Sequence, residues 1–322
     1  MRVGINPEKE KSKKLKYKLF RIIIPLYIPE NEAAYFNNAL QVFQKCMYSL
    51  FETIDEEKTN ITIINNNCKK DVTDYVNDLL SEKRIDRHVH CKENYGKIYT
   101  VIQEARGCYE KYIAIVDSDV FFFTGWQVEV LKVFENFKNV GVVGLTPDVN
   151  TAFYCNSSLF FKEWLFVKKG KIVDNKELEL FEEGINKKDF FITINKNWKN
   201  SQFYLEKNNV KAIVGAGHFA SVYKKEVFKH LTFKKPIYVF PGGELNFLDK
   251  PLDKQGYYRL SLIKAFAYHM GNTIPEWLLE KKLKKNILNL RHHNEGKKSD
   301  LNFYYFFKSL FLRILRRFKF YK

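Results

Sequence analysis

The sequence lacks the cysteine pattern of a disulfide-stapled or zinc-binding domain. Its 322 residues include five cysteines, and none of them belongs to a CxxC pair. An odd number of cysteines without paired spacing argues against both a disulfide framework and a zinc site. We therefore expect reduced, structural thiols in a cytoplasmic protein.

Long apolar runs are also missing. The first apolar stretch, Leu19 to Ile28, is short and is interrupted by Arg21 and Pro25. A helix that spans a bilayer needs about 20 consecutive apolar residues, and a secretory leader needs an uninterrupted apolar centre. The sequence therefore predicts neither a membrane-spanning segment nor a signal peptide.

Lys and Arg outnumber Asp and Glu only near the two ends of the chain. The formal net charge is +17. Residues 1–21 hold eight Lys and Arg against two Glu, residues 281–300 hold seven against two acids, and residues 301–322 hold six and no acid. These stretches account for the whole excess, so residues 22–280 are neutral. This distribution argues against a nucleic-acid partner for the central body.

What the chain does contain is a buried strand that ends in two aspartates. The apolar run Tyr112 to Val116 is followed by Asp117, Ser118 and Asp119. Residues two apart on a strand share a side, so both carboxylates can face one ligand. Two convergent carboxylates suit a hard divalent cation and the phosphates that it neutralises. A strand followed by an ordinary polar turn is the alternative interpretation.

Strands and helices are expected to alternate along the first half of the chain. Apolar β-branched runs predict strands, and apolar residues at helical spacing predict helices. The expected strands cover residues 20–26, 61–64, 88–91, 112–116 and 140–145, and the expected helices cover 38–53, 71–80, 97–108 and 126–137. This alternation predicts an α/β fold with a parallel sheet and helices on both faces.

Ligands of such sheets bind outside the carboxyl ends of the strands. The loops after the expected strands carry polar residues that suit a nucleotide ligand, and these are Tyr27, Glu30, Asn65, Asn66, Glu93, Asn94, Lys97, Asp117 and Asp119. The sequence therefore predicts a ligand site at this edge of the sheet.

The chain resembles the GT-A fold glycosyltransferases, and most closely the large family-2-like group of bacterial enzymes. The motifs that carry the resemblance occur in the family's order across residues 20–280, and they are the opening strand with Pro25, IINNN (63–67), ENYGK (93–97), VDSDVFF (116–122), GHFASVYKKEVF (217–228), residues 243–256 and AYHMGN (267–272). The resemblance implies a Rossmann-like, mostly parallel sheet and a cytoplasmic transferase that uses a nucleotide-sugar donor.

The resemblance also implies which residues bind the donor. The first three loops of such enzymes hold the base and the ribose, which here places Pro25, Tyr27, Asn65 or Asn66, and Lys97 at the nucleotide. Family members often have an aspartate where this chain has Asn65 and Asn66, so the contact to the base departs from the family pattern. Glu30, in the first of these loops, and Ser118, between the two aspartates, also belong to the expected donor site.

A metal ion is a further implication of the resemblance. The aspartate pair would bind Mn²⁺ or Mg²⁺ that bridges the donor's diphosphate, with Asp119 as the direct ligand and Asp117 also serving the ribose or a water. His269 stands where many family members have a histidine that completes the site. An imidazole beside carboxylate and phosphate oxygens suits Mn²⁺. A structural histidine at the end of a strand is the alternative.

An inverting transferase also needs a general base for the acceptor hydroxyl. Family members carry a GED…R…G arrangement at the start of a helix, and this chain has Gly242-Gly243-Glu244 with Leu245 in place of the second acid. Glu244 is the candidate base, and Asp249 and Asp253 are the alternatives. An acid that merely favours the helix dipole is the other interpretation of Glu244.

Two further segments remain open at this stage. Gly217 and His218 follow an expected strand at 210–214, and the resemblance implies contacts with the donor sugar, although a structural turn would look the same. Residues 150–205 match no motif and contain Trp164 and Trp198. An acceptor-binding or lid insertion and a local hydrophobic cluster both fit them.

The C-terminus predicts an amphipathic helix over residues 303–321. One expected face is apolar, with Phe303, Phe307, Leu310, Phe311, Ile314, Leu315, Phe318 and Tyr321. The cations Lys308, Arg313, Arg316, Arg317 and Lys319 fall largely on the other face. An apolar stripe beside cations, without acids, is typical of a helix that lies on anionic lipid. A helix docked on its own domain is the alternative.

Together these features predict a basic extension (1–19), a GT-A domain (20–280) and a membrane-associating tail (281–322). The expected activity is metal-dependent, inverting transfer of a sugar to a glycan or lipid-linked acceptor for cell-surface polysaccharide, at the cytoplasmic face of the inner membrane. A sugar nucleotidyltransferase is one rival, but its Gly-rich basic loop is missing from residues 27–33. A non-enzymatic membrane- or RNA-binding protein is the other rival.

Overall fold

The computed structural model describes residues 4–7, 16–30, 33–191, 196–231, 243–285, 287–288 and 305–318. Its strands are β1 (Phe20–Leu26), β2 (Thr59–Asn66), β3 (Arg87–Cys91), β4 (Tyr112–Val116), β5 (Val120–Phe122), β6 (Val140–Gly144), β7 (Lys168–Gly170), β8 (Gln202–Lys207), β9 (Val210–Val214), β10 (Ala220–Lys224), β11 (Tyr258–Ser261) and β12 (Ala267–His269). Its α-helices are α1 (Ala39–Phe51), α2 (Lys70–Ser81), α3 (Lys97–Gly107), α4 (Trp126–Asn136), α5 (Ser157–Glu163), α6 (Asn175–Gly184), α8 (Lys250–Lys254) and α9 (Tyr305–Phe318). Most of the expected extension 1–19, together with Gly242, Phe303, Lys319 and Tyr321, lies outside the described residues.

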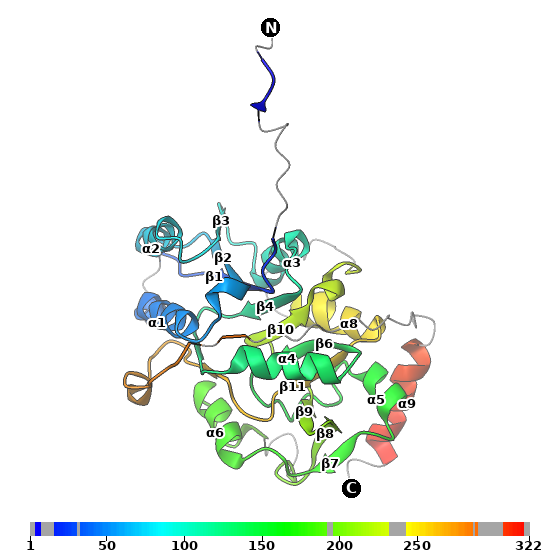
Figure 1. The fold of residues 1–322 in the computed structure, drawn as a ribbon. Helices are drawn as coiled ribbons and strands as arrows, with labels where there is room; N and C mark the ends of the chain where they lie inside the picture. The colour runs from blue at the N-terminus through cyan, green and yellow to red at the C-terminus, as the bar shows by residue number, and fades with distance from the viewer. Residues whose placement is uncertain are drawn as a thin grey trace.

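One large mixed sheet organises the fold (Figure 1). Its strand order is β3-β2-β1-β4-β10-β6-β11-β9-β8-β7. Strands β3, β2, β1 and β4 pair parallel with one another in that order, and β11 is parallel to β6. Strand β10 runs antiparallel between β4 and β6, and β9 runs antiparallel to β11 and β8. The predicted α/β class with a mostly parallel sheet is confirmed, and the antiparallel strands are additions that alternation alone did not predict.

The order of the first four strands marks a ligand-binding edge. Strands β2 and β3 follow β1 outwards on one side, whereas β4 pairs with the opposite side of β1. The chain therefore adds strands first on one side of β1 and then, with β4, on the other side. Open α/β sheets bind ligands at the carboxyl ends of the strands at such a reversal. Here that edge is the end of β1 and β4, where the Asp-x-Asp sequence begins.

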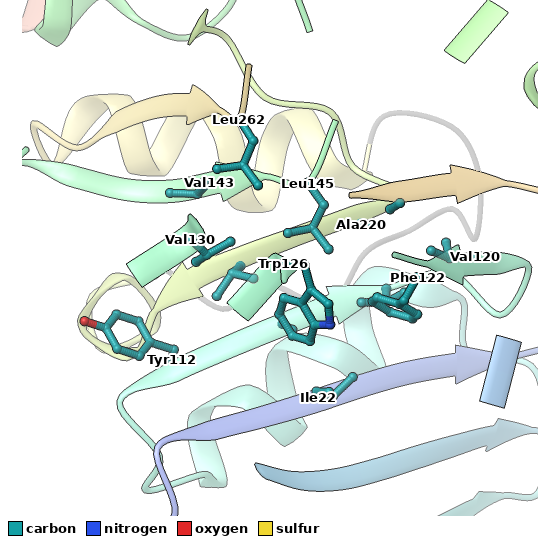
Figure 2. Close-up of a cluster of buried hydrophobic side chains, with 14 of the residues drawn as sticks. Ile22, Tyr112, Val120, Phe122, Trp126, Val130, Val143, Leu145, Ala220 and Leu262 are labelled. Atoms are coloured by element: carbon teal, nitrogen blue, oxygen red, sulfur yellow. The ribbon is translucent and has the colours of Figure 1, made fainter. Parts of the chain in front are cut away.

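Alternate residues of the central strands enter hydrophobic cores on opposite faces of the sheet. Ile22 of β1 packs in the same core as residues of α1, α2 and α4, whereas Ile23 packs with residues of α3 and α8. Figure 2 shows Trp126 of α4 within the first core, where its ring centroid lies 5.6 Å from that of Phe122. Burial on both faces explains why these strands read as nearly continuous apolar runs.

Strand β10 brings a second loop to the ligand-binding edge. Because it is antiparallel to β4, its first residue, Ala220, pairs with the last residue of β4, Val116. The residues just before β10 therefore reach the end of β4. The backbone N–H of Asp117 donates to the carbonyl of Phe219 over 2.7 Å, which fixes the two loops to each other.

Residues 150–205 contribute α5, α6, the edge strand β7 and the first residues of β8, which lies between β7 and β9. Trp198 is buried in a small core with Val173 and Leu178. Trp164 packs edge-on against Phe311 of α9, with ring centroids 6.3 Å apart. Trp198 therefore packs as part of a local hydrophobic cluster, whereas Trp164 is half-buried against α9.

Helix α9 lies alongside α5 (Figure 1) and confirms the expected C-terminal helix. The predicted polar face needs one correction, because Lys308 is fully buried. Its Nζ lies 3.3 Å from the hydroxyl of Ser158 in α5, so the hydrocarbon stem packs inwards while the ammonium finds an oxygen partner. The apolar residues also divide between two sides. Leu312 and Leu315 are buried in the main core.

The outward side of α9 keeps a mixed apolar and cationic surface. Phe307, Leu310 and Ile314 are 57%, 43% and 47% exposed. Arg313 and Arg317 are exposed on the same helix. Across the part of the chain that the structure describes, no helix has both the length and the apolarity that crossing a bilayer requires.

Candidate active site

Asp117, Asp119 and His269 converge at the carboxyl end of β4. One carboxylate oxygen from each aspartate and one ring nitrogen of His269 all lie within 4.8 Å of one another. The closest approach joins His269 Nε2 and Asp119 Oδ2, at 3.3 Å. The three residues that the sequence proposed as metal ligands are therefore brought together, although they come from positions about 150 residues apart.

A second, two-stranded sheet produces this convergence. Strand β12 pairs antiparallel with β5, so that His269 stands opposite Val120. The N–H of Met270 donates to the carbonyl of Asp119 over 2.8 Å. The backbone of His269 is thus tied to the residue that follows the second aspartate, which leaves its ring next to the Asp119 carboxylate.

The three side chains fit a divalent cation. Asp119 Oδ1 is buried and has no hydrogen-bond partner among the described residues. Burial, together with the charge of Asp117, raises the pKa of Asp119 to about 6 even though His269 opposes the shift. A cation at this point would offset the cost of burying that charge. Two carboxylates and one imidazole form a ligand set suited to Mn²⁺ and compatible with Mg²⁺.

Lys97, the first residue of α3, lies beside this group. Its Nζ is 2.5 Å from Asp117 Oδ1 and 3.7 Å from Glu244 Oε1. Burial by itself lowers the pKa of Lys97, but the charges of Asp117, Glu244 and Asp119 outweigh burial, and the net shift is upwards. Gly96 begins the helix at φ +79°, a conformation that favours glycine. The ammonium therefore stays charged at the rim of the site.

The loops after β1 and β2 hold the remaining expected donor-site residues. Tyr27 and Glu30 are exposed, and Pro25 is half-buried. Asn65 and Asn66 are buried at the end of β2, and their side chains hold the protein's own loops. Asn65 Oδ1 accepts from Cys68 N over 2.8 Å. Asn66 Oδ1 accepts from Tyr95 N, and Asn66 Nδ2 donates to Gly96 O, which positions the turn before Lys97.

Glu244 lies on the other side of Lys97. It directly precedes η5 (Leu245–Asp249), a π-helical turn. Such turns occur often at functional sites because the widened turn re-aims side chains. The carboxylate of Glu244 is partly exposed. Glu244 is therefore accessible at the rim, within a short distance of the residues that surround the aspartate pair.

Asp249, by contrast, is fully buried. It forms an ion pair with the guanidinium of Arg259, which is also fully buried. Its other oxygen lies 2.7 Å from His218 Nε2. The carboxylate is thus committed to two internal partners. Asp253, the remaining alternative base, is buried as well and accepts hydrogen bonds from the first two residues of α5.

His218 reaches the site from the loop before β10. Burial, followed by the charge of Arg259, lowers the pKa of His218 to about 4, so the ring is neutral at physiological pH. In the neutral form Nε2–H donates to Asp249, and Nδ1 is left as an acceptor. Gly217 and Ser118 lie half-buried in the loops beside it. Gly215, at φ +133°, has no room for a Cβ atom, which would meet the carbonyl of Asp148 at 2.5 Å.

Three residues of the site were missed by the sequence analysis. Arg259 was assigned to no element from the sequence, and Tyr154 belonged to the unassigned segment 150–205. The Arg259 guanidinium lies 5.1 Å from the ring centroid of Tyr154, and that ring packs against His218. Burial and the charges of Asp119 and Asp117 raise the pKa of Tyr35. Nothing in the local sequence around these three residues signalled their position.

The sequence also matches a family model. The model of glycosyl transferase family 2 matches residues 33–232, which is well over half of the chain. The chain therefore belongs to glycosyl transferase family 2, and the predicted resemblance and the predicted enzyme class are confirmed. No curated protein matches the chain.

Solved structures provide weaker similarities. Residues 1–349 of TarS from S. aureus share 14% identity with a TM-score of 0.40, and the match covers 78% of this chain and 60% of that one. The mannosyltransferase PcManGT from Pyrobaculum calidifontis, in complex with GDP-Man and Mn²⁺, shares 12% identity with a TM-score of 0.43, and the match covers 76% of this chain and 55% of that one. The match thus spans less than two thirds of either protein, and identification rests on the family model.

Proposed function

We propose that the protein is a metal-dependent, inverting glycosyltransferase that uses a nucleotide-sugar donor. The observation that carries this proposal is the cluster of Asp117, Asp119 and His269 beside Lys97, at the carboxyl end of β4. A diphosphate needs both a divalent cation and a further positive charge to leave as an anion. At this edge of the sheet, the three clustered side chains can bind the cation, and Lys97 supplies the further positive charge.

Different residues around the cluster bind different parts of the donor in this proposal. Asp119 and His269 would hold Mn²⁺ or Mg²⁺, with Asp117 as the third ligand. The bound cation would supply charge stabilisation for the departing nucleoside diphosphate. Lys97 binds a donor phosphate oxygen or the ribose, and Tyr27, Pro25, Glu30 and Ser118 line the nucleotide's approach. The buried Asn65 and Asn66 position these loops and form the floor beneath the base.

Glu244 is the proposed general base. The acceptor O–H proton passes to its carboxylate while the acceptor oxygen forms a bond to the anomeric carbon. The bond from that carbon to the diphosphate oxygen breaks, and its electron pair leaves with the phosphate. Asp249 is unsuited to this role because its carboxylate is occupied by Arg259 and His218. It instead orients His218, whose Nδ1 accepts a hydrogen bond from a sugar hydroxyl.

The surface of α9 supports a membrane-bound acceptor. Phe307, Leu310 and Ile314 are exposed beside Arg313 and Arg317, and the described part of the helix contains no acid. Apolar side chains that enter the headgroup region next to cations favour anionic lipid. We propose that residues 301–322 hold the enzyme on the cytoplasmic face of the inner membrane, where it extends a glycan or lipid-linked acceptor for cell-surface polysaccharide.

A donor screen tests the proposal. The purified protein is incubated with a panel of nucleotide sugars, and release of nucleoside diphosphate is measured with Mn²⁺, with Mg²⁺ and with a chelator. We expect turnover of at least one donor that depends on the metal and is lost in Asp119→Ala. The control is Asp78→Ala, which removes an exposed aspartate of α2. Turnover that persists in Asp119→Ala, or in the chelator, contradicts the metal-dependent mechanism.

A further inference from the structure

Helix α6 is attached to strand β12 by a row of hydrogen bonds. Glu177 Oε2 accepts from Ala265 N over 2.6 Å. Glu183 Oε1 accepts from Tyr268 Oη over 2.9 Å and from Trp277 Nε1 over 3.1 Å. These partners lie before, within and after β12. The acidic run of α6 therefore faces the strand that carries His269, although the helix belongs to a segment with no recognisable motif.

The last residue of α6 contacts the imidazole itself. His269 Nδ1 lies 3.2 Å from the carbonyl oxygen of Gly184. A carbonyl oxygen can only accept, so Nδ1 must carry the hydrogen. The other nitrogen, Nε2, faces the Asp119 carboxylate at 3.3 Å and is the nitrogen left for a cation, because Nδ1 is taken by Gly184. The free imidazole in water has no such fixed preference for this tautomer.

We propose that the Gly184 carbonyl is the positioning group that fixes the tautomer and the orientation of His269 for metal binding. Histidines that bind metals commonly donate their second ring N–H to a carboxylate or a carbonyl, which keeps the binding nitrogen unprotonated and aimed at the ion. This inference deepens the proposed function and rests on His269 being a ligand. It assigns to α6, within the unassigned segment 150–205, the role of positioning His269.

Close packing explains why a glycine occupies this position. A Cβ atom on residue 184 would lie 2.6 Å from the backbone oxygen of His269 and 3.3 Å from its Cβ. Only glycine lets the end of α6 approach the strand closely enough for the hydrogen bond. Phe219 packs edge-on against the imidazole at 5.4 Å and itself contacts Phe181 of α6. The ring is therefore held both by the Gly184 carbonyl and by an aromatic neighbour that α6 supports.

Nitrogen NMR on the metal-free protein tests the tautomer directly. Histidine is labelled with ¹⁵N, and His269 is assigned by its loss in His269→Gln. In the metal-free protein we expect Nδ1 to show the shift of a protonated nitrogen, because it donates to the Gly184 carbonyl. An Nε2–H tautomer for His269 overturns the proposal. Since no metal or donor is present, this result is independent of the proposed activity.

A glycine substitution tests the consequence for the metal. Gly184→Ala should weaken Mn²⁺ binding, measured by calorimetry or by the EPR signal of free Mn²⁺, by about 10- to 100-fold. The matched control is Gly170→Ala in β7, where a Cβ atom meets only Tyr204 at 4.0 Å. We expect the control to bind Mn²⁺ as the wild type does. A folded Gly184→Ala protein with unchanged Mn²⁺ affinity overturns the proposal.

A second variant covers the case in which Gly184→Ala does not fold. Glu183→Ala removes the acceptor shared by Tyr268 and Trp277 and leaves residue 184 as glycine, so it loosens the attachment of α6 without a clash. We expect a smaller loss of Mn²⁺ affinity, of several-fold, together with partial loss of the Nδ1–H signal. Unchanged values of both contradict a positioning role for α6. If the wild-type protein shows the Nδ1–H signal but turns over no donor, the proposed function is refuted and the positioning role of Gly184 is not.

Discussion

The ammonium of Lys97 lies 2.5 Å from the carboxylate of Asp117. This ion pair joins the first residue of a helix to the first residue after a strand, across the edge where the sheet reverses its order. It holds a cation next to a proposed metal ligand. In the proposed mechanism the donor phosphates would replace Asp117 as the partner of Lys97, and the metal would bind the aspartate.

Lys97→Met is expected to lower donor turnover by about 10²-fold, because a charge-stabilising group of an active site contributes on that scale. The exposed Lys168, which pairs with Glu206 far from the site, provides the matched control as Lys168→Met. Steady-state kinetics with the preferred donor measure the effect. Equal activity of the two variants contradicts the role of Lys97.

Glu244→Gln is expected to reduce kcat of sugar transfer by about 10²- to 10⁴-fold, the usual range for removing a general base. The donor affinity should stay close to that of the wild type, because glutamine keeps the shape of the side chain. Donor titration and transfer kinetics separate the two quantities. Asp253→Asn, at a buried acid that supports α5, is the comparison for a purely structural loss. A normal kcat in Glu244→Gln assigns the base to another group.

Breaking the buried ion pair is expected to be costly. Arg259→Met should lower the free energy of unfolding by about 3–5 kcal/mol, because it removes the opposite charge and leaves the buried Asp249 carboxylate with the neutral His218 ring as its partner. The double variant Asp249→Leu/Arg259→Met should recover part of this loss. Urea unfolding measures each value. Lys168→Met, which breaks an exposed ion pair, is the comparison and should cost much less. If Arg259→Met lowers the free energy of unfolding as little as Lys168→Met does, the stabilising role of the buried ion pair is contradicted.

The stability of the protein should depend on the protonation of His218. Its folded pKa, about 4, lies below the ordinary imidazole value of 6.5. The unfolded chain therefore binds the proton more readily in this range, and the contribution of His218 to stability is present above about pH 6.5 and is lost as the pH falls towards 4. His218→Gln should show a flatter pH dependence of the unfolding free energy than the wild type. Parallel curves for the two proteins contradict the assignment.

The outer face of α9 should control binding to anionic vesicles. The triple variant Phe307→Ser/Leu310→Ser/Ile314→Ser is expected to sediment less with vesicles that contain phosphatidylglycerol, at unchanged activity on a water-soluble acceptor. Deletion of the tail is a poorer test, because it also uncovers the core that Leu312 and Leu315 fill. Leu80→Ser, at an exposed leucine of α2, is the control. Full vesicle binding by the triple variant contradicts the membrane role.

Much of the nucleotide side of the site could be predicted from local sequence. Strands β1, β2 and β4 are buried on both faces, so their apolar runs are nearly uninterrupted, and the residues after them occupy a known edge of the sheet. The spacing of Asp117 and Asp119 then suffices to place two carboxylates together. Even the boundaries of α1 to α4 agree with the expected helices within a few residues, because each helix has a clear apolar stripe.

The other side of the site could not be predicted in this way. Strand β12 has only three residues, and its partner β5 lies about 150 residues earlier in the chain. No local sequence pattern therefore predicts that β5 and β12 pair. Arg259 sits in an apolar strand and is stable there only because Asp249 compensates its charge. The burial of Lys308 likewise depends on a neighbour, Ser158 of α5. Contacts of this kind are properties of the assembled fold.

The inverted direction of β10 has a practical consequence for redesign. Because this strand starts at the rim, the loop that carries Gly217 and His218 arrives there from a different part of the chain than the strands beside the diphosphate. Grafting a foreign loop between β9 and β10 should alter the contacts that we propose for the transferred sugar while the registers of β1, β2 and β4 stay as they are. Sugar preference and nucleotide preference should thus be exchangeable as separate modules.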